Sequence, residues 1–394
     1  MSECPVDWST DFDVFDKSFV IDPYQVWDEL RQECPMAHTE RHGGSWMPTS
    51  YDLIAQIAYD TDHFSSRNVG VVGGDGGVPL LVAPPITSDP PFHTAARRLL
   101  LPVFAPKRVE TLRPLTESIA NELLDKIGTR GRADAAVEYA QHIPVRVIAH
   151  MLGVADTLEE TFTDWVRRLL QVGPTDLEVA TRAAREVLDF FRQQADVRRA
   201  HPSDDLISYL VNADIDGDPL TNKHLLGTCF LILIAGIDTT WSSIGSSLWH
   251  LATHPADRDQ LVADPSLVPI AVEEFLRAYS PVTMARVVDK AVEIDGRTLE
   301  PGERVLLPFP AGNRDPDKFD SPDEVRIDRA HNRHFAFGIG IHRCLGSNLA
   351  RMELEVAIRT WLARYPSFCL ADSAVVEWTG GQVRGPRSIP VVLA

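Results

Sequence analysis

Apolar residues recur at three- and four-residue spacing along much of the chain, which indicates helices that bury one face. This spacing runs from Arg108 to Arg199 and returns from Pro269 to Tyr279 and from about Cys344 to Tyr365. Lys223 to Thr253 is apolar on most sides, which predicts one long buried helix. From Val287 to Leu307 apolar and polar residues alternate around an Asp-Gly turn, which predicts a β-hairpin. The pattern therefore predicts a mainly α fold with small β-sheets.

Size and charge narrow the class of protein. The chain has 394 residues and a net charge of −18, and its length predicts two domains or one large fold. The negative charge opposes binding to nucleic acid and to anionic lipid. The most apolar run, Leu225 to Ile237, is shorter than the ~18 residues of a membrane span. Residues 1–15 lack the apolar core of a signal peptide. We therefore expect no nucleic acid partner, no membrane anchor and a cytoplasmic location.

One of the five cysteines lies in a motif that indicates a cofactor. Residues 337–346 read Phe-Gly-Ile-Gly-Ile-His-Arg-Cys-Leu-Gly, and the last long helix is predicted to begin at this cysteine, Cys344. The glycines permit a tight turn and close approach to a flat ligand, and a helix start favours a thiolate. A thiolate axial ligand promotes O–O cleavage by haem iron. The alternatives are a buried structural cysteine and a zinc site, but His342 and Cys344 lack further ligands at zinc spacing.

This motif resembles the cysteine loop of the cytochrome P-450 family, the haem-thiolate monooxygenases, and matches the pattern Phe-Gly-x-Gly-x-His-x-Cys-x-Gly throughout. Five further segments agree in order, so the resemblance covers nearly the whole chain. It implies the P-450 fold, with haem b (iron protoporphyrin IX) sandwiched between the long buried helix and the cysteine loop. Cys344 would be the iron ligand, and Phe337, Gly338 and Gly346 would belong to the haem site. Residues 1–394 would form one haem-binding catalytic domain, with a small β-rich part at roughly 36–70 and 287–310.

Small residues lie beside an acid and an alcohol in the long helix, in Ala235-Gly236-Ile237-Asp238-Thr239. Gly236 costs about 1 kcal/mol against Ala in a helix, so another group is expected to pack closely there. A Thr hydroxyl can bond back to the carbonyl one turn earlier and open a kink, which would form a groove for O2. From these residues alone, a capping Thr and a solvated Asp are the better explanation. The resemblance implies instead that Ala235 and Gly236 line the haem site, that Asp238 relays protons and that Thr239 hydrogen-bonds the bound oxygen.

Two further sets of charged residues match the family. Glu274 and Arg277 lie three residues apart on a predicted helix and can form an ion pair. The resemblance adds Arg329 and makes the three a structural support beneath the cysteine loop. Buried haem propionates need cationic or strongly donating partners. The resemblance places four residues there, although each taken alone could be an ordinary surface charge or a capped histidine: His93, Arg97, Arg286 and His342.

The resemblance implies a monooxygenase that consumes O2 and two electrons from NAD(P)H. The chain has neither a dinucleotide-binding glycine motif nor iron–sulfur cysteine spacing. We therefore expect a ferredoxin and a ferredoxin reductase, or a fused reductase absent from this chain. Four arginines are candidates for a basic docking patch near Cys344: Arg98, Arg108, Arg343 and Arg351.

In detail the chain is most similar to a bacterial subgroup that includes reductase-fused members and oxidisers of aryl ethers and thiocarbamates. This similarity implies a small organic substrate, aromatic or alkyl-aryl, that is hydroxylated or dealkylated. The candidate pocket residues are the loop from Gly70 to Pro85, which we expect to be a surface loop or lid, the segment from Trp165 to Pro174, and Leu233, Ala235, Val282 and Thr283. The alternatives are a peroxide-driven peroxygenase or isomerase, and a haem sensor or electron carrier. The acid–alcohol pair favours O2 activation, because none of these alternatives needs it.

Overall fold

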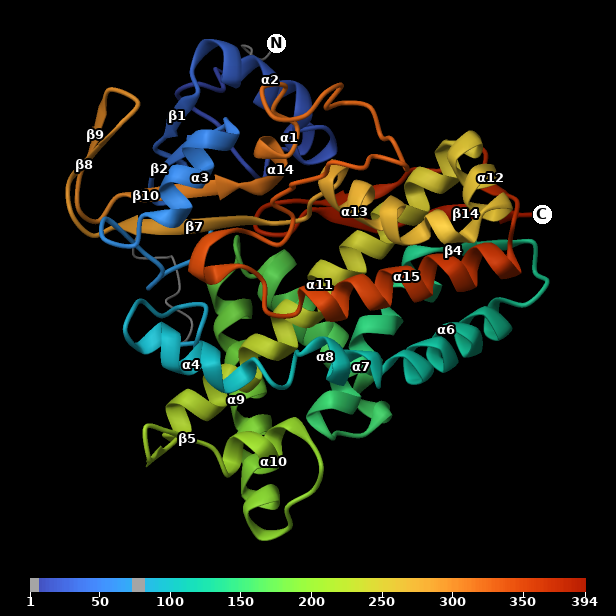
Figure 1. Cartoon of the computed structure of the whole chain (residues 1–394), viewed down its shortest axis with the longest axis horizontal. Coiled ribbons are helices and arrows are strands. Elements are labelled where there is room, and N and C mark those ends of the chain that lie inside the picture. Colours follow the sequence, from blue (N-terminus) through green and yellow to red (C-terminus); the bar gives the residue numbers. More distant parts are fainter. Residues whose placement is uncertain (1–6, 73–81) are drawn as a thin grey trace.

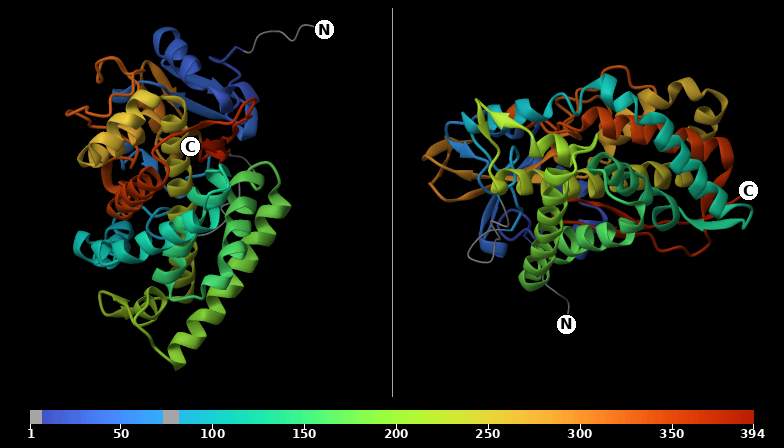
Figure 2. Two further views of the ribbon diagram at one scale, coloured as in Figure 1. Left: turned by 90° about the vertical axis from the view of Figure 1, so that its right-hand side faces the viewer. Right: turned by 90° about the horizontal axis from the view of Figure 1, so that it is seen from below.

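The computed structural model describes residues 7–72 and 82–394. Figure 1 shows a β-rich part at one end of the molecule, a helical part at the other, and the helices α11 and α15 between them; Figure 2 shows the same arrangement from two other sides. The predicted mainly α fold with small sheets is confirmed. The assignment of residues 1–394 to one haem-binding catalytic domain stays a prediction.

The β-rich part is built on a five-stranded sheet in the order β1-β2-β10-β7-β3. Strand β10 pairs antiparallel with β7 and parallel with β2. Short helices and aromatic side chains such as Phe12 and Trp27 cover the sheet and form a hydrophobic core with it. The elements of this part are β1 (Met36–Thr39), β2 (Ser45–Pro48), β3 (Phe64–Ser65), β7 (Thr283–Val288), β10 (Arg304–Pro308), α1 (Lys17–Ile21), α2 (Tyr24–Glu33), η1 (Arg41–Gly43), α3 (Tyr51–Tyr59) and α14 (Phe309–Gly312).

The predicted hairpin is an insertion between β7 and β10. It consists of β8 (Val292–Ile294) and β9 (Arg297–Leu299). Its turn residues, Asp295 and Gly296, both have positive φ (51° and 69°), as the tight hairpin turn of an Asp-Gly pair requires.

The helical part packs around α11 (Asn222–Thr253). This helix begins after Thr221, whose hydroxyl accepts a hydrogen bond from the His224 N–H, and ends at His254, before Pro255. By length and composition α11 could cross a membrane, but 72% of its most apolar stretch is buried within the fold. The other helices are α4 (Phe92–Leu100), α5 (Pro106–Glu110), α6 (Arg113–Ile127), η2 (Ala136–Ala140), α7 (His142–Leu152), η3 (Asp156–Leu158), α8 (Glu159–Val166), η4 (Arg167–Val172), α9 (Leu177–Ala200), α10 (Leu206–Val211), α12 (Pro255–Ala263), η5 (Pro265–Leu267), α13 (Val268–Ala278), η6 (Gly340–His342) and α15 (Ser347–Arg364).

Three small sheets complete the fold. The C-terminal strand lies between β11 and β4, so that the last residues of the chain are hydrogen-bonded into a sheet. A hairpin just before it packs on α11. The strands are β4 (Arg132–Asp134), β5 (Asp214–Ile215), β6 (Asp218–Pro219), β11 (Phe368–Leu370), β12 (Glu377–Thr379), β13 (Gly385–Ser388) and β14 (Pro390–Leu393).

Candidate functional site

A cavity of about 400 Å³ lies between α11 and the loop that carries Cys344. Most of its surface is apolar. The helix and the loop contribute the residues that the sequence selected: Ala235, Gly236 and Thr239 from α11, and Phe337, Gly338, His342, Cys344 and Gly346 from the loop. The cavity therefore brings the cysteine motif and the alcohol of the acid–alcohol pair to one place.

Local hydrogen bonds shape the cysteine loop. The Cys344 N–H donates to the Phe337 carbonyl (2.7 Å), which closes the loop on itself. Gly338 and Gly340 have positive φ (61° and 70°), and a Cβ at Gly340 would lie 2.8 Å from the carbonyl oxygen of Ala58. Both positions therefore require glycine.

The prediction that α15 begins at Cys344 is wrong, because the helix begins at Ser347. The thiol nevertheless faces the cavity. Burial raises the pKa of Cys344, while the N–H of Gly346 and three nearby arginines oppose this effect. A metal ion that binds the sulfur would hold it as a thiolate.

The four predicted propionate partners come together beside the loop. Arg97, Arg286 and His342 line the cavity, and His93 packs against His342 with ring centroids 4.4 Å apart. Burial lowers the pKa of Arg286 to about 10, against the opposing effect of Asp89. Within the described part of the chain, the Nε2 atom of His342 is buried and has no hydrogen-bond partner.

These cationic and unpartnered groups, placed beside an apolar cavity with a cysteine thiol, fit one kind of ligand. A flat apolar molecule with carboxylates at one edge would fill the cavity, and its carboxylates would pair with the buried cations. Haem b has this form, so the residues present fit the predicted cofactor.

The acid and the alcohol of α11 face in different directions. Thr239 lines the cavity, and its hydroxyl donates to the Ala235 carbonyl (2.8 Å). The helix is continuous from Asn222 to Thr253, so the predicted kink is not seen. A Cβ at Gly236 would lie 2.5 Å from Ile148, which confirms the predicted close packing.

Asp238 is fully buried and is not part of the cavity wall. Its Oδ1 atom lies 2.9 Å from Nη2 of Arg387, and Gln171 donates to the same oxygen (3.3 Å). Burial raises the pKa of Asp238, and Arg387 and Gln171 oppose this effect. Sequence reasoning missed Arg387, and it placed Gln171 only within a predicted wall segment and not beside Asp238. Arg387 lies in β13, which packs on α11, and no motif described above selects it.

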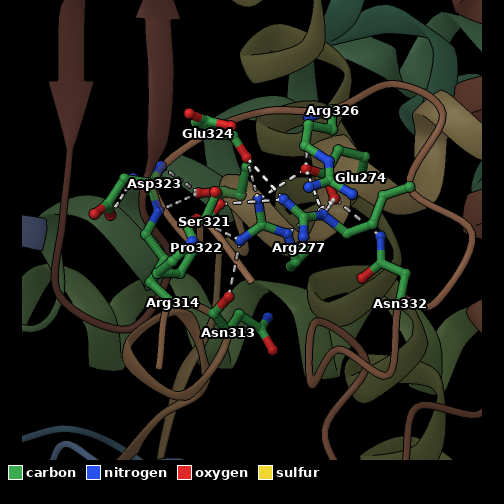
Figure 3. A network of polar contacts seen from close by, with 12 residues as sticks. Glu274, Arg277, Asn313, Arg314, Ser321, Pro322, Asp323, Glu324, Arg326 and Asn332 are labelled. Carbon is green, nitrogen blue, oxygen red and sulfur yellow. Dashed lines mark hydrogen bonds and ion pairs between the residues drawn. The ribbon is translucent and has the colours of Figure 1, made fainter. Parts of the chain in front are cut away.

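The predicted structural support is an extended buried network (Figure 3). Arg277 donates to both carboxylate oxygens of Glu274 (2.9 and 2.8 Å), and both side chains are fully buried. Arg329 contacts the same carboxylate at 3.0 Å. Sequence reasoning missed Asn332, whose side chain donates to Glu274, and the Arg326 N–H, which also donates to it.

The predicted pocket residues divide into two groups. Ala235 and Val282 line the cavity, but Leu233 and Thr283 do not, so the last two predictions are wrong. Leu233 is fully buried on the other side of α11. Side chains alternate along β7, which directs Met284 and Arg286 to the cavity and Thr283 away from it, and Val282 just before the strand also lines the cavity.

Both predicted wall segments contribute residues to the cavity wall. Leu169, Leu170, Gly173 and Pro174 line it from η4 and the turn that follows. From the Gly70–Pro85 loop, Gly70, Val71, Val72, Ala83 and Pro85 line it. Residues 73–81 of this loop lie outside the described residues.

The predicted basic docking patch is smaller than expected. Arg98 and Arg343 are exposed, and Arg108 contacts Asp204 only at 3.8 Å. Arg351 instead makes two hydrogen bonds to Glu273 (2.6 and 2.9 Å) and lies over the Phe337 ring. Arg351 therefore supports the cysteine loop, and the prediction that it belongs to a free patch is wrong.

Comparisons with known proteins identify the family to which a chain with this fold and this site belongs. The family model for Cytochrome P450 matches residues 158–264 and 259–376. The chain is 34% identical to 6-deoxyerythronolide B hydroxylase of Saccharopolyspora erythraea, over 97% of this chain and 98% of that protein. It is 37% identical to mycinamicin IV hydroxylase/epoxidase of Micromonospora griseorubida, over 92% of this chain and 94% of that protein.

A solved structure is similar over its whole length. The bacillaene polyketide synthase cytochrome P450 PksS of Bacillus subtilis 168 superposes with a TM-score of 0.89 at 32% identity, covering 97% of this chain and 100% of that one. The chain therefore belongs to the cytochrome P450 family and is a monooxygenase of that family, which implies haem and a redox partner. One of these relatives is named for a polyketide synthase and the other two for 6-deoxyerythronolide B and mycinamicin IV, so they do not bear out the aryl-ether and thiocarbamate subgroup.

Proposed function

We propose that the protein inserts one atom of O2 into a small, largely apolar organic molecule, by hydroxylation or oxidative dealkylation. The observation that carries this proposal is the convergence of Cys344, the buried cations and Thr239 on one apolar cavity. Haem supplies the oxygen chemistry when it is bound. Cys344 would hold its iron, and Arg97, Arg286 and His342, with His93 behind them, would hold its carboxylates.

The residues of α11 handle protons. The Thr239 hydroxyl already donates to Ala235, so it is oriented with its lone pairs toward the cavity, where it can accept a hydrogen bond. The neighbouring Asp238 lies on the buried side of the helix and provides a carboxylate that can take up and release a proton. Apolar walls keep bulk water from this pair, which limits the loss of protons and electrons to side reactions.

For the substrate we retain aromatic and alkyl-aryl compounds and add polyketides, which the names of the relatives suggest. The cavity has apolar walls that suit either class, formed by Met284 from β7, Val282 just before it, and Leu169 and Leu170 from η4. A panel of 4-nitroanisole and 6-deoxyerythronolide B would separate the two classes. Displacement of water from the iron, seen as a spin-state shift in the absorption spectrum, would identify the binder.

The electrons would come from NAD(P)H through a ferredoxin and its reductase, or through a fused reductase. The exposed Arg98, Arg108 and Arg343 are the candidates for contact with an acidic donor. We also propose a cytoplasmic location, with no nucleic acid or membrane partner.

The test of the proposed function is the carbon monoxide difference spectrum of the reduced protein, beside that of Cys344→Ser. We expect the Soret band typical of thiolate-ligated haem in the wild type and its loss in the variant, because a serine oxygen does not replace a thiolate ligand. A band typical of histidine-ligated haem, or no bound haem, would refute the proposal. Turnover with hydrogen peroxide that exceeds turnover with O2 and a donor would favour a peroxygenase instead.

A further inference from the structure

The amide of Gln382 interrupts an apolar part of the cavity wall. Gln382 lies in the turn that joins β12 to β13, and it lines the cavity together with the side chains of Val282, Met284 and Val383. These three neighbours contact a ligand through apolar surface, which gives affinity without fixing the direction of the ligand. A few polar groups usually provide that direction in an apolar pocket.

The backbone of the turn is held in place. Gly381 has a positive φ (82°), and a Cβ there would lie 2.4 Å from the Phe15 ring, so this position requires glycine. The Gln382 carbonyl accepts a hydrogen bond from the Thr283 N–H (3.0 Å), which joins the turn to β7. The side chain of Gln382 therefore extends from a fixed point.

Two contacts orient the amide. Its Nε2 atom donates to the Val69 carbonyl (3.3 Å) and lies 3.6 Å from Sδ of Met284. A carbonyl oxygen and a thioether sulfur are acceptors, so the nitrogen of the amide faces them and not its oxygen. Among the described residues no group donates to the Oε1 atom of Gln382, which can therefore accept a hydrogen bond.

The segment beside this oxygen is also fixed, and it leaves space. The Val69 carbonyl accepts a second hydrogen bond, from the Ala285 N–H (3.0 Å), and the buried Arg304 donates to the Gly70 carbonyl. Gly70 lines the cavity, and a Cβ on it would lie 4.0 Å from Gln382 Oε1. Because residue 70 is glycine, no side chain from it occupies the space beside this oxygen.

Several other polar side chains at the cavity wall are already engaged within the protein. Asn68 accepts the Gly70 N–H (3.1 Å), Thr87 accepts the Ala83 N–H (2.7 Å), and Arg67 pairs with Asp289 (2.6 Å). The open acceptor of Gln382 differs from them in this respect.

We propose that Gln382 is a specificity-determining residue, whose Oε1 atom accepts a hydrogen bond from a hydroxyl or N–H group of the substrate. The substrate is then an apolar molecule with such a donor at one end, and the donor sets which of its carbons is oxidised. The inference rests on the proposed function, because it concerns the substrate of that same site.

Imidazoles that coordinate haem iron measure where the donor group must lie. The probes are 1-(ω-hydroxyalkyl)imidazoles of increasing chain length. Each is compared with its ω-fluoro analogue, which has a similar size but donates no hydrogen bond. The shift of the Soret band of the ferric holoenzyme gives the Kd of each compound. In the wild type we expect the ratio of the two Kd values to favour the alcohol most at one chain length, by at least ~3-fold over the other lengths, as one hydrogen bond would provide.

Three variants separate direct contact from an effect on the wall. Gln382→Met keeps the length of the side chain but removes the acceptor, so the preference for the alcohol at that length should disappear. Gln382→Asn keeps an amide on a side chain one methylene shorter, so the preference should move to a longer probe. Thr87→Val is the matched control and should keep the wild-type profile, since Thr87 also lines the cavity but its hydroxyl already accepts the Ala83 N–H.

The absence of this preference at every chain length in the wild type would overturn the inference, and that measurement does not depend on whether a variant folds. A preference that persists unchanged in Gln382→Met, or that is lost equally in Thr87→Val, would overturn it as well. Failure of the proposed function would look different, because the reduced protein would then lack the thiolate-type carbon monoxide band, whatever the imidazoles show.

Discussion

The Glu274–Arg277 pair offers the clearest test of how the cysteine loop is supported. Arg277→Met removes the guanidinium but keeps an apolar side chain of similar length. Besides Glu274, the guanidinium donates to the carbonyls of Asn313, Pro322 and Glu324, all at 3.0 Å or less. The substitution therefore leaves three carbonyls without this donor and leaves the buried carboxylate with one arginine fewer.

The size of the expected loss in the free energy of unfolding follows from these contacts. An unpaired buried polar group costs ~1–3 kcal/mol, and a broken buried ion pair costs ~3–5 kcal/mol. Arg329 and Asn332 remain on Glu274 and compensate part of its charge. We therefore expect the free energy of unfolding to fall by about 4 kcal/mol, a large share of the ~5–15 kcal/mol of a typical domain.

Urea unfolding followed by far-ultraviolet circular dichroism measures this loss. The control is Arg182→Met, which breaks an ion pair of similar length (2.8 Å) with Glu178 whose side chains are 63% and 85% exposed. We expect that change to stay within about 0.5 kcal/mol. A loss below 1 kcal/mol in Arg277→Met would refute the reasoning that burial makes this pair important.

Two further predictions concern packing and acid stability. In Gly227→Ala, the new Cβ would lie 2.0 Å from the Val82 carbonyl oxygen, so we expect a loss of ~1–3 kcal/mol in urea unfolding. Gly70→Ala, which meets only ordinary contacts, should stay near the wild type, and equal losses would contradict the prediction. Burial raises the pKa of Glu273, but Arg351 and His334 outweigh it and lower that pKa to about 2. Because the folded-state pKa lies below the unfolded value of 4.5, this stabilisation is complete above pH 4.5 and is lost between pH 4.5 and about 2. In acid unfolding over this range, the free energy of unfolding should therefore fall less steeply with pH in Glu273→Gln than in the wild type. Equal slopes for the two proteins would contradict the prediction.

The parts of the site that sequence predicted well have local signals. The glycine spacing around Cys344 indicates a tight loop whatever the rest of the chain does, and the long, mostly apolar run from Lys223 to Thr253 is enough to find α11. The predicted start of α15 was wrong because the helix begins at Ser347, after Gly346, whose carbonyl accepts a hydrogen bond from the Ala350 N–H. The apolar spacing of a helix does not show at which of several neighbouring residues the helix begins.

The parts that sequence missed depend on contacts between distant segments. Leu233 was placed in the pocket wrongly because α11 is apolar on nearly all sides, so the sequence does not show which face meets the cavity. Arg387 and Gln171 reach Asp238 only after β13 and η4 pack on α11. Thr283 was a different kind of error, since the two-residue period of a strand would have selected Met284 in its place.

The alternation along β7 has a consequence for engineering this enzyme. One strand supplies both part of the pocket wall, through Met284, and the carboxylate anchor Arg286, and Val282 just before the strand adds to the wall. Substitutions at 282 and 284 can reshape the pocket while the anchor stays in place. Insertion or deletion of a single residue in the strand would turn it over, exchanging Arg286 for Ala285 or Val287 at the cavity. Libraries that vary length should therefore leave 282–286 intact, whereas libraries that vary side chains can begin there.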